Sequence, residues 1–174
     1  DTIRQVSREF PINKITSKET RSKIQYLKKC LLKYRKITGV GRGIAAIQVG
    51  IPERFAVIYR PEEKENLLVI INPRITNTSR KILKFPEACM SEGPIFAPVV
   101  RPSWIEFEYY DEKGRKQMWN TKDLDLQSRV HNRVFQHEID HMDGVIFLDK
   151  AVLKELTLES DPKYYDRAKF EEVT

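Results

Sequence analysis

Residues 137–141 read HEIDH, in which two histidines stand four residues apart and a glutamate follows the first. On an α-helix, residues with this spacing lie about 40° apart around the axis, so both imidazoles face the same side. Such a pair binds one divalent metal ion, and the adjacent glutamate takes a proton from the attacking water in metal-assisted hydrolysis. The run therefore predicts a helix with His137 and His141 as metal ligands and Glu138 as the base.

A catalytic metal site of this kind needs a third protein ligand. His131 is excluded by geometry, because it lies about 120° around the same helix from His137. Cys30 belongs to an apolar pattern with helical spacing, which favours a small core residue. Cys89 stands between proline breaks and outside any periodic stripe, so its thiolate is a candidate ligand that the spacing alone leaves open.

Three segments of the chain resemble the motifs of one enzyme family. Residues 41–48 read GRGIAAIQ, residues 87–91 read EACMS, and residues 136–141 read QHEIDH. They are similar to the G-x-G-[LI]-A-A-x-Q, E-G-C-L-S and Q-H-E-x-D-H motifs of peptide deformylases, in the family order and at similar separations. The resemblance spans almost the whole chain and implies a single deformylase-like catalytic domain over residues 1–174.

The resemblance also implies the chemistry of the site. Cys89 would complete the metal set with His137 and His141. A thiolate and two imidazoles suit Zn²⁺, whereas the resemblance implies Fe²⁺, with Ni²⁺ or Co²⁺ accepted in purified protein. The Gln48 side-chain amide and the Met90 backbone N–H would donate hydrogen bonds to the oxyanion formed during hydrolysis. The expected reaction removes the N-formyl group from the starting methionine of nascent polypeptides and releases formate.

Substrate recognition is expected from the glycine-rich segment and from one face of the predicted helix. Gly41 and Gly43 would let an extended peptide approach closely and pair as an added strand. Val134 and Val130 precede His137 by one and two turns on nearly the same helix face, so they can line a slot for the methionine side chain. Plain core packing is the alternative for the two valines.

The segment around the cysteine departs from the family pattern. Ala88 stands where the family has glycine, and an arginine commonly found after the cysteine motif has no counterpart in residues 92–97.

Two charged groups are further candidates for a place in or beside the site. Arg101 is a candidate ion-pair partner of Glu87, and Asp140 is a candidate acceptor that orients a ligand histidine.

Periodicity and turn signals predict the remaining elements. A capping box at residues 16–19 predicts an amphipathic helix to about Ile37, with a stop at Gly39. Strands are predicted at residues 55–59, 67–71 (closed by Pro73), 105–109 and 115–120, and a helix from about residue 125 to 142. The expected fold is α+β: mainly antiparallel strands packed around a central metal-binding helix, with an N-terminal amphipathic helix.

Composition limits the partners and the setting. Hydrophobic residues make up 40% of the chain and charged residues 32%, and no apolar run reaches 18 residues, so no membrane association is expected. The net charge of +6 is scattered, which favours a solvated surface over specific DNA binding and leaves ribosome association possible. The resemblance implies bacterial cytoplasm; because the chain does not begin with Met, a mitochondrion or plastid after loss of a targeting segment is the alternative.

Two other functions compete with the deformylase interpretation. One is a catalytically idle relative that keeps the fold and binds peptide or ribosome, which Ala88 and the missing arginine would favour. The other is a general zinc protease, in which Glu155 or Glu159 would replace Cys89 as the third ligand.

Overall fold

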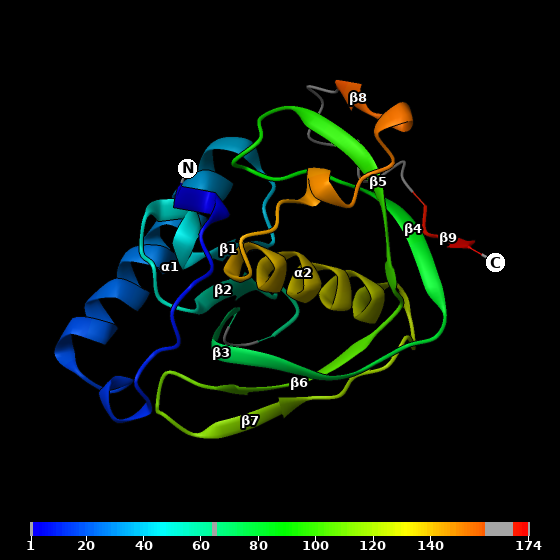
Figure 1. The fold of residues 1–174 in the computed structure, drawn as a ribbon. Coiled ribbons are helices and arrows are strands. Elements are labelled where there is room, and N and C mark those ends of the chain that lie inside the picture. Colours follow the sequence, from blue (N-terminus) through cyan, green and yellow to red (C-terminus); the bar gives the residue numbers. More distant parts are fainter. Residues whose placement is uncertain (1, 64–65, 159–168, 174) are drawn as a thin grey trace.

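The computed structural model describes residues 2–63, 66–158 and 169–173. Its long elements are two helices and two sheets (Figure 1). The helices are α1 (Lys18–Thr38) and α2 (Leu126–Met142), and the strands are β1 (Gly43–Ala45), β2 (Phe55–Tyr59), β3 (Leu67–Thr78), β4 (Ile82–Glu87), β5 (Ile95–Pro102), β6 (Ile105–Tyr110), β7 (Lys116–Trp119), β8 (Thr157–Leu158) and β9 (Glu171–Val173). Short 3₁₀ turns lie at Thr2–Arg4, Ile12–Lys14, Ala46–Val49, Phe147–Asp149 and Leu153–Glu155.

The strands form one sheet in the order β1-β2-β3-β6-β7 and a second in the order β8-β5-β4-β9. Neighbouring strands in both sheets are antiparallel. The predicted α+β architecture with antiparallel strands is therefore confirmed. None of the helices in the described ranges is long and apolar enough to cross a bilayer.

Both faces of β2 are buried, because α1 covers one side of its sheet and α2 covers the other. Phe55 and Val57 belong to a hydrophobic cluster with the α1 residues Ile24, Leu27 and Leu31. Ala56 and Ile58 point the other way and belong to a cluster with the α2 residues Phe135, Ile139 and Met142. The opposite side of α2 contacts β4 and β5, where Arg133 donates to the Leu83 and Val99 carbonyls. Helix α2 thus lies between the two sheets (Figure 1).

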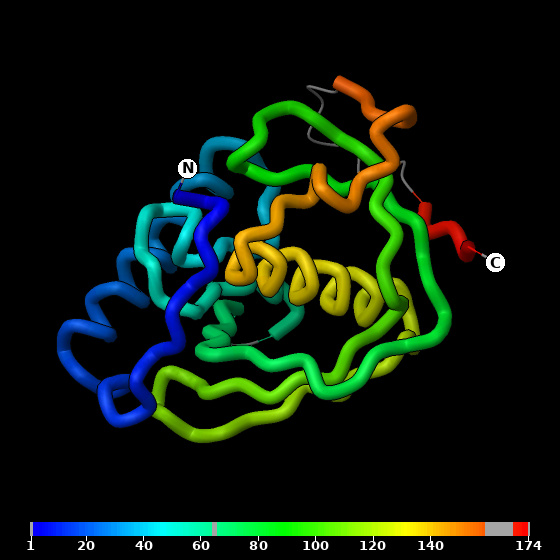
Figure 2. Tube along the Cα trace, in the orientation of Figure 1, coloured from blue at the N-terminus to red at the C-terminus, as the bar shows by residue number. Residues whose placement is uncertain are grey.

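The N-terminal segment runs past the end of α2 (Figure 2). The Ser7 backbone N–H donates to the Met142 carbonyl at 2.8 Å and so satisfies one of the free carbonyls at the helix end. Helix α1 is capped by Ser17, whose Oγ accepts from the Thr20 N–H at 3.2 Å. The prediction that Thr16 begins the capping box is therefore wrong by one residue.

Prolines misled the prediction of strands. Pro73 does not close β3, which continues to Thr78 with a shift in its register against β6 between Ile71 and Arg74. Strands β4 and β5 were not predicted, because their prolines suggested breaks. Pro86 faces Pro98 across this pair, so the two missing N–H groups fall at a single position of the ladder.

Candidate active site

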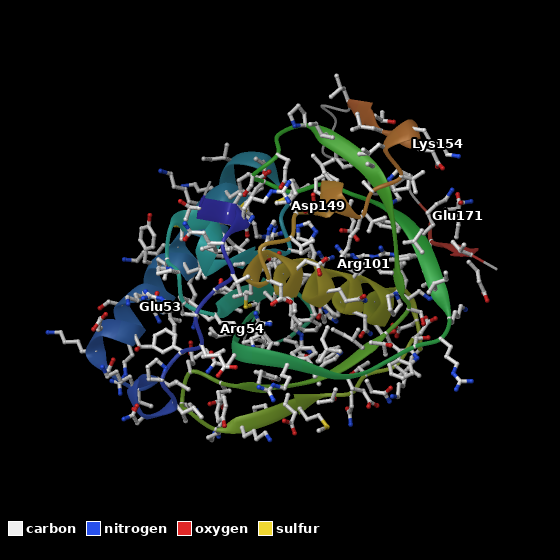
Figure 3. The ribbon with its side chains drawn as sticks, viewed as in Figure 1. Glu53, Arg54, Arg101, Asp149, Lys154 and Glu171 are labelled. Carbon is white, nitrogen blue, oxygen red and sulfur yellow. The ribbon has the colours of Figure 1, made fainter. Side chains whose placement is uncertain are left out.

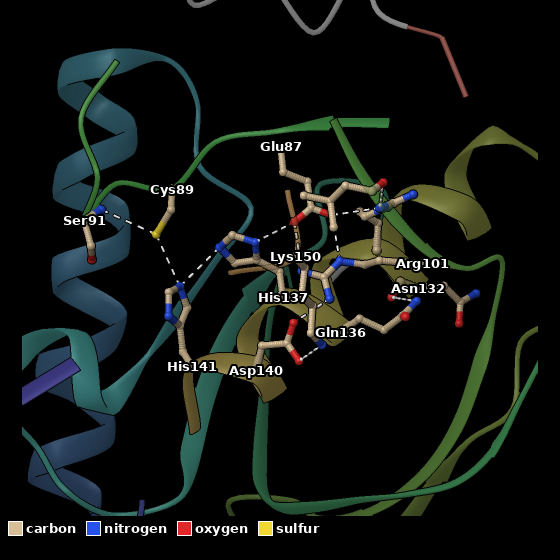
Figure 4. A network of polar contacts seen from close by, with 12 residues as sticks. Glu87, Cys89, Ser91, Arg101, Asn132, Gln136, His137, Asp140, His141 and Lys150 are labelled. Atoms are coloured by element: carbon tan, nitrogen blue, oxygen red, sulfur yellow. Dashed lines mark hydrogen bonds and ion pairs between the residues drawn. The ribbon is translucent and has the colours of Figure 1, made fainter. Parts of the chain in front are cut away.

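Helix α2 and the loop after β4 bring three metal-ligating atoms together. Cys89 Sγ lies 3.2 Å from His141 Nε2, which lies 3.2 Å from His137 Nε2 (Figure 4). The candidate ligand atoms of these three residues all lie within 4.8 Å of one another. Cys89 and His141 are buried and His137 is half-buried. One thiolate and two imidazole nitrogens are a donor set that fits a divalent transition metal.

Glu87 fixes the orientation of His137. Its carboxylate lies 3.0 Å from His137 Nδ1, so Nε2 is left to face Cys89 and His141. Arg101 donates to both carboxylate oxygens, at 2.7 and 2.9 Å, and Arg133 donates to one of them at 2.9 Å. The predicted Glu87–Arg101 pair is therefore confirmed. Burial alone would raise the pKa of Glu87, but Arg101, His137 and Arg133 hold that pKa well below its usual range.

Asp140 does not orient a histidine, so that prediction is wrong. Its two carboxylate oxygens accept from Arg101 at 2.5 Å and from Lys150 at 2.6 Å (Figure 4). Arg101 lies in the interior beside α2, whereas Lys154 and Glu171 stand at the outside of the molecule (Figure 3). The group that orients His137 is Glu87. Its spacing of two residues from Cys89 is the sequence signal that could have identified it, because such residues share a side of an extended segment.

The two histidines of this candidate metal group differ in their electrostatic surroundings. Burial opposes a charge on His137, yet its hydrogen bonds to Cys89 and Glu87 raise its pKa well above the ordinary value. For His141, burial and the neighbouring His137 lower the pKa to about 3, so its ring is neutral near pH 7. A neutral imidazole is the form that binds a metal.

Glu138 is the buried carboxylate that follows His137 of the candidate metal group. It is 3% exposed, and its Oε2 has no hydrogen-bond partner among the residues that the structure describes. Burial raises the pKa of Glu138 to about 7. Gly43 makes room for this side chain, because a Cβ there would lie 2.4 Å from Glu138 Oε1. Gly41 has φ +104°, a conformation that favours glycine.

Gln48 points its amide at the cysteine. Its Nε2 lies 3.3 Å from Cys89 Sγ and 3.0 Å from Ser91 Oγ, while its Oε1 accepts from the Ala45 N–H at 2.8 Å. The Ser91 N–H also donates to Cys89 Sγ, at 3.4 Å. Burial raises the pKa of the Cys89 thiol, so the sulfur needs such donors, or a cation, to be held as a thiolate.

A cavity of about 880 Å³ opens beside these groups. The predicted catalytic residues Gln48, Met90 and Glu138 line it, together with Cys89 and His137. The predicted substrate residues Gly41, Gly43, Val130 and Val134 line it as well. Val134 also packs against the α2-side hydrophobic cluster. His141 is not among the residues that line it. His131 is outside the candidate metal group, and its Nε2 lies 2.7 Å from Glu62 Oε1.

The family model described as polypeptide deformylase matches residues 1–156. The chain belongs to the peptide deformylase family. The peptide deformylase of Picosynechococcus sp. is 41% identical over 125 residues, which are 71% of this chain and 63% of that protein. The enzyme of Pelagibacter ubique is 40% identical over 63% of this chain and 61% of its own length. The chain thus spans less than two thirds of these relatives.

Solved structures of deformylases share the fold. The crystal structure of a peptide deformylase from Legionella pneumophila has a TM-score of 0.74 and 26% identity, and the match covers 88% of this chain and 83% of that one. A peptide deformylase from Synechococcus elongatus, solved in complex with actinonin, has a TM-score of 0.69 and 32% identity over 87% of this chain and 74% of its own.

Several cavity residues of this deformylase-family chain were not predicted. Arg133 precedes His137 by one helical turn, so the periodicity that indicated Val130 and Val134 could have found it. Arg35 also lines the cavity and donates to the Gly41 carbonyl at 2.5 Å. The rings of Phe85 and Phe170 line it too, and no local sequence signal links them.

Proposed function

We propose that the chain is a metal-dependent hydrolase that removes the N-formyl group from the N-terminal formylmethionine of nascent polypeptides and releases formate. One observation carries this proposal. Glu138, buried and with a free carboxylate oxygen, lines the same cavity as Cys89 and His137. That arrangement supplies a base directly beside a site for a divalent cation, which is what metal-assisted amide hydrolysis requires. A single catalytic domain over residues 1–174 would carry the activity.

The proposed metal ligands are Cys89, His137 and His141, with α2 as the central metal-binding helix. A thiolate and two imidazoles suit Zn²⁺, and the family resemblance favours Fe²⁺, while Ni²⁺ or Co²⁺ would be accepted by purified protein. A bound ion would supply Lewis-acid chemistry, polarising the formyl oxygen and lowering the pKa of water towards roughly 7. Glu87 would keep the His137 ring oriented for the ion through its hydrogen bond at Nδ1.

Glu138 is proposed as the general base. Its Oε2 would take the proton of the attacking water and return it to the amine nitrogen that leaves. The oxyanion formed when water attacks the formyl carbon would accept hydrogen bonds from the Gln48 amide and the Met90 backbone N–H. The position of Gln48 supports this role, because its Nε2 reaches Cys89 Sγ at 3.3 Å while Ala45 holds the other end of the amide.

The peptide is proposed to bind along β1. This strand stands at the edge of its sheet, with β2 on one side, so an extended peptide can pair with its other side. Gly41 and Gly43 lie at its start and line the cavity. The methionine side chain would then enter the slot beside Val130 and Val134 on α2.

The competing functions fare differently. For the protease, Glu155 is engaged by Lys84 at 3.2 Å and belongs to no metal-ligating group among the described residues, and Glu159 lies outside the described residues. The idle relative keeps the fold but not the chemistry, so activity alone separates it from the enzyme. Ribosome association and a bacterial cytoplasmic setting are further parts of the proposal, and a mitochondrion or plastid is the alternative setting.

The test is formate release from a formyl-Met-Ala-Ser peptide by the chain loaded anaerobically with Fe²⁺, Zn²⁺ or Ni²⁺. Formate should appear with at least one ion and fall to background in the metal-free protein. The acetylated peptide is the matched control when hydrolysis is followed by the free amino terminus that both reactions release, because its acyl group would leave as acetate. Binding of the formylated peptide without formate release, with every ion, would favour the idle relative.

A further inference from the structure

Strand β9 brings an aromatic side chain to the cavity. It pairs with β4, with Glu171 opposite Lys84, and the two side chains form an ion pair at 3.1 Å. Phe170 directly precedes β9, and its ring stacks on Phe85 of β4 with centroids 4.2 Å apart and planes 19° from parallel. Both rings line the cavity. The pairing of β9 with β4 therefore positions Phe170 beside Phe85 in the cavity wall.

Arg133 joins this aromatic pair to α2. Its guanidinium carbon lies 5.7 Å from the centroid of the Phe170 ring. The guanidinium group is immobilised, because it donates to Glu87 and to the Leu83 and Val99 carbonyls, and the residue is 7% exposed. On the helix, Arg133 is adjacent to Val134 and one turn after Val130. The Phe170 ring is thus held over the same face of α2 that carries the proposed methionine slot.

The cavity has two ends along α2. Residues 130 and 137 are about 10 Å apart along a helix axis, at about 1.5 Å per residue. His137 and Glu138 mark the end with the candidate ligand atoms, Val130 marks the other, and Arg133 lies between them. Phe170 lies over Arg133 and stacks on Phe85, so a side chain that extends along the slot from the candidate ligand atoms towards Val130 meets these rings.

We propose that Phe170 is a specificity-determining residue that forms, with Phe85, the end wall of the slot for the first side chain of the peptide. This inference rests on the proposed function. A methionine side chain is unbranched and flexible, and its sulfur packs favourably against aromatic rings. A bulkier first side chain meets the rings and is excluded. Phe170 lies outside the residues 1–156 matched by the family model, so the matched segment contains only the Phe85 side of this wall.

The experiment compares Phe170→Ala and Phe170→Leu with the parent on formyl-Met-Ala-Ser and formyl-Phe-Ala-Ser. Shortening the wall should raise the ratio of kcat/KM for the phenylalanine peptide over the methionine peptide by about tenfold in Phe170→Ala, a change expected of a pocket that gains space. The change in this ratio should come mainly from a lower KM for the phenylalanine peptide. The ratio for Phe170→Leu should lie between that of the parent and that of Phe170→Ala.

Val173→Ala is the matched control, because Val173 belongs to the same strand, pairs with Ile82 and leaves the ring in place. Its selectivity ratio should equal that of the parent. Thermal melting should show all variants folded. An unchanged ratio in folded Phe170→Ala would overturn the proposal, and so would an equal shift in Val173→Ala, since the effect would then come from the attachment of the strand.

A binding measurement separates this inference from the proposed function. Calorimetric titration with the products Met-Ala-Ser and Phe-Ala-Ser should show that Phe170→Ala loses the preference of the parent for the methionine peptide. If the parent releases no formate, the proposed function fails, and the titration still decides on the wall. An unchanged preference in Phe170→Ala would overturn the inference whether or not formate is released.

Discussion

The two ends of the cavity are built in different ways. At one end Cys89, His141 and Glu138 are buried polar groups, each with a displaced pKa and a position fixed by its neighbours. At the other end Phe85 and Phe170 are half-buried rings held by stacking and strand pairing. Buried polar networks tolerate little change, whereas a half-buried apolar wall can be reshaped. Substitutions at the first end should therefore stop the chemistry, and those at the second should change which peptide reacts.

The largest effect is expected for Glu138→Gln. The amide is nearly isosteric but cannot accept the water proton, so turnover should fall by about 10²–10⁴-fold. Metal content and melting temperature should stay close to those of the parent. Parental activity in a metal-loaded Glu138→Gln protein would show that Glu138 is not the base. It would also contradict the expectation that substitutions at the first end stop the chemistry.

Arg101→Met tests the buried charges behind the first end. It removes a guanidinium that is 2% exposed and leaves Glu87 without its main partner, which should cost about 3–5 kcal/mol of unfolding free energy. For a chain of this size that corresponds to a fall of about 6–20 °C in melting temperature. Arg115→Met is the control, because Arg115 is 63% exposed in its pair with Asp111 and should contribute at most about 1 kcal/mol. Equal melting temperatures in the two variants would show that the buried ion pairs of Arg101 do not stabilise the fold.

Gln48→Ala should lower kcat by about 10²-fold, equivalent to about 3 kcal/mol in the activation barrier, because one oxyanion donor is lost. The rate of formate release at saturating formyl-Met-Ala-Ser measures kcat directly. Ser91→Ala, which removes the other partner of the same amide, is the control and should change kcat much less. A larger loss of kcat in Ser91→Ala than in Gln48→Ala would show that Gln48 is not the oxyanion donor.

Val134→Trp tests the second end and should give the smallest effect. The larger side chain fills the slot without touching a ligand atom, so KM for formyl-Met-Ala-Ser should rise by about tenfold while kcat changes little. A formyl-Ala peptide, which does not use the depth of the slot, should be less affected. If folded, metal-loaded Val134→Trp handles the methionine peptide like the parent, the slot lies elsewhere.

The same two ends differ in how far the sequence predicts them. His137, Glu138 and His141 stand within five consecutive residues, and Cys89 follows from a family motif, so local spacing and resemblance were enough. The partners that fix them were harder to predict. Glu87 was assigned to Arg101 but not to His137, because that contact depends on how β4 meets α2. Phe170 could not be placed, since its position depends on the pairing of β9 with β4, and nothing in the local sequence specifies that pairing.

The central claim is that Cys89, His137 and His141 hold one divalent ion, and metal content tests it most directly. Cys89→Ser and Cys30→Ser should be purified side by side, loaded with Zn²⁺, dialysed and analysed for bound metal. Cys30→Ser should retain one ion per chain like the parent, because Cys30 is outside the ligand group. Cys89→Ser should lose most of its metal, because a neutral hydroxyl replaces a thiolate. Full retention of metal by Cys89→Ser would contradict the proposed ligand set.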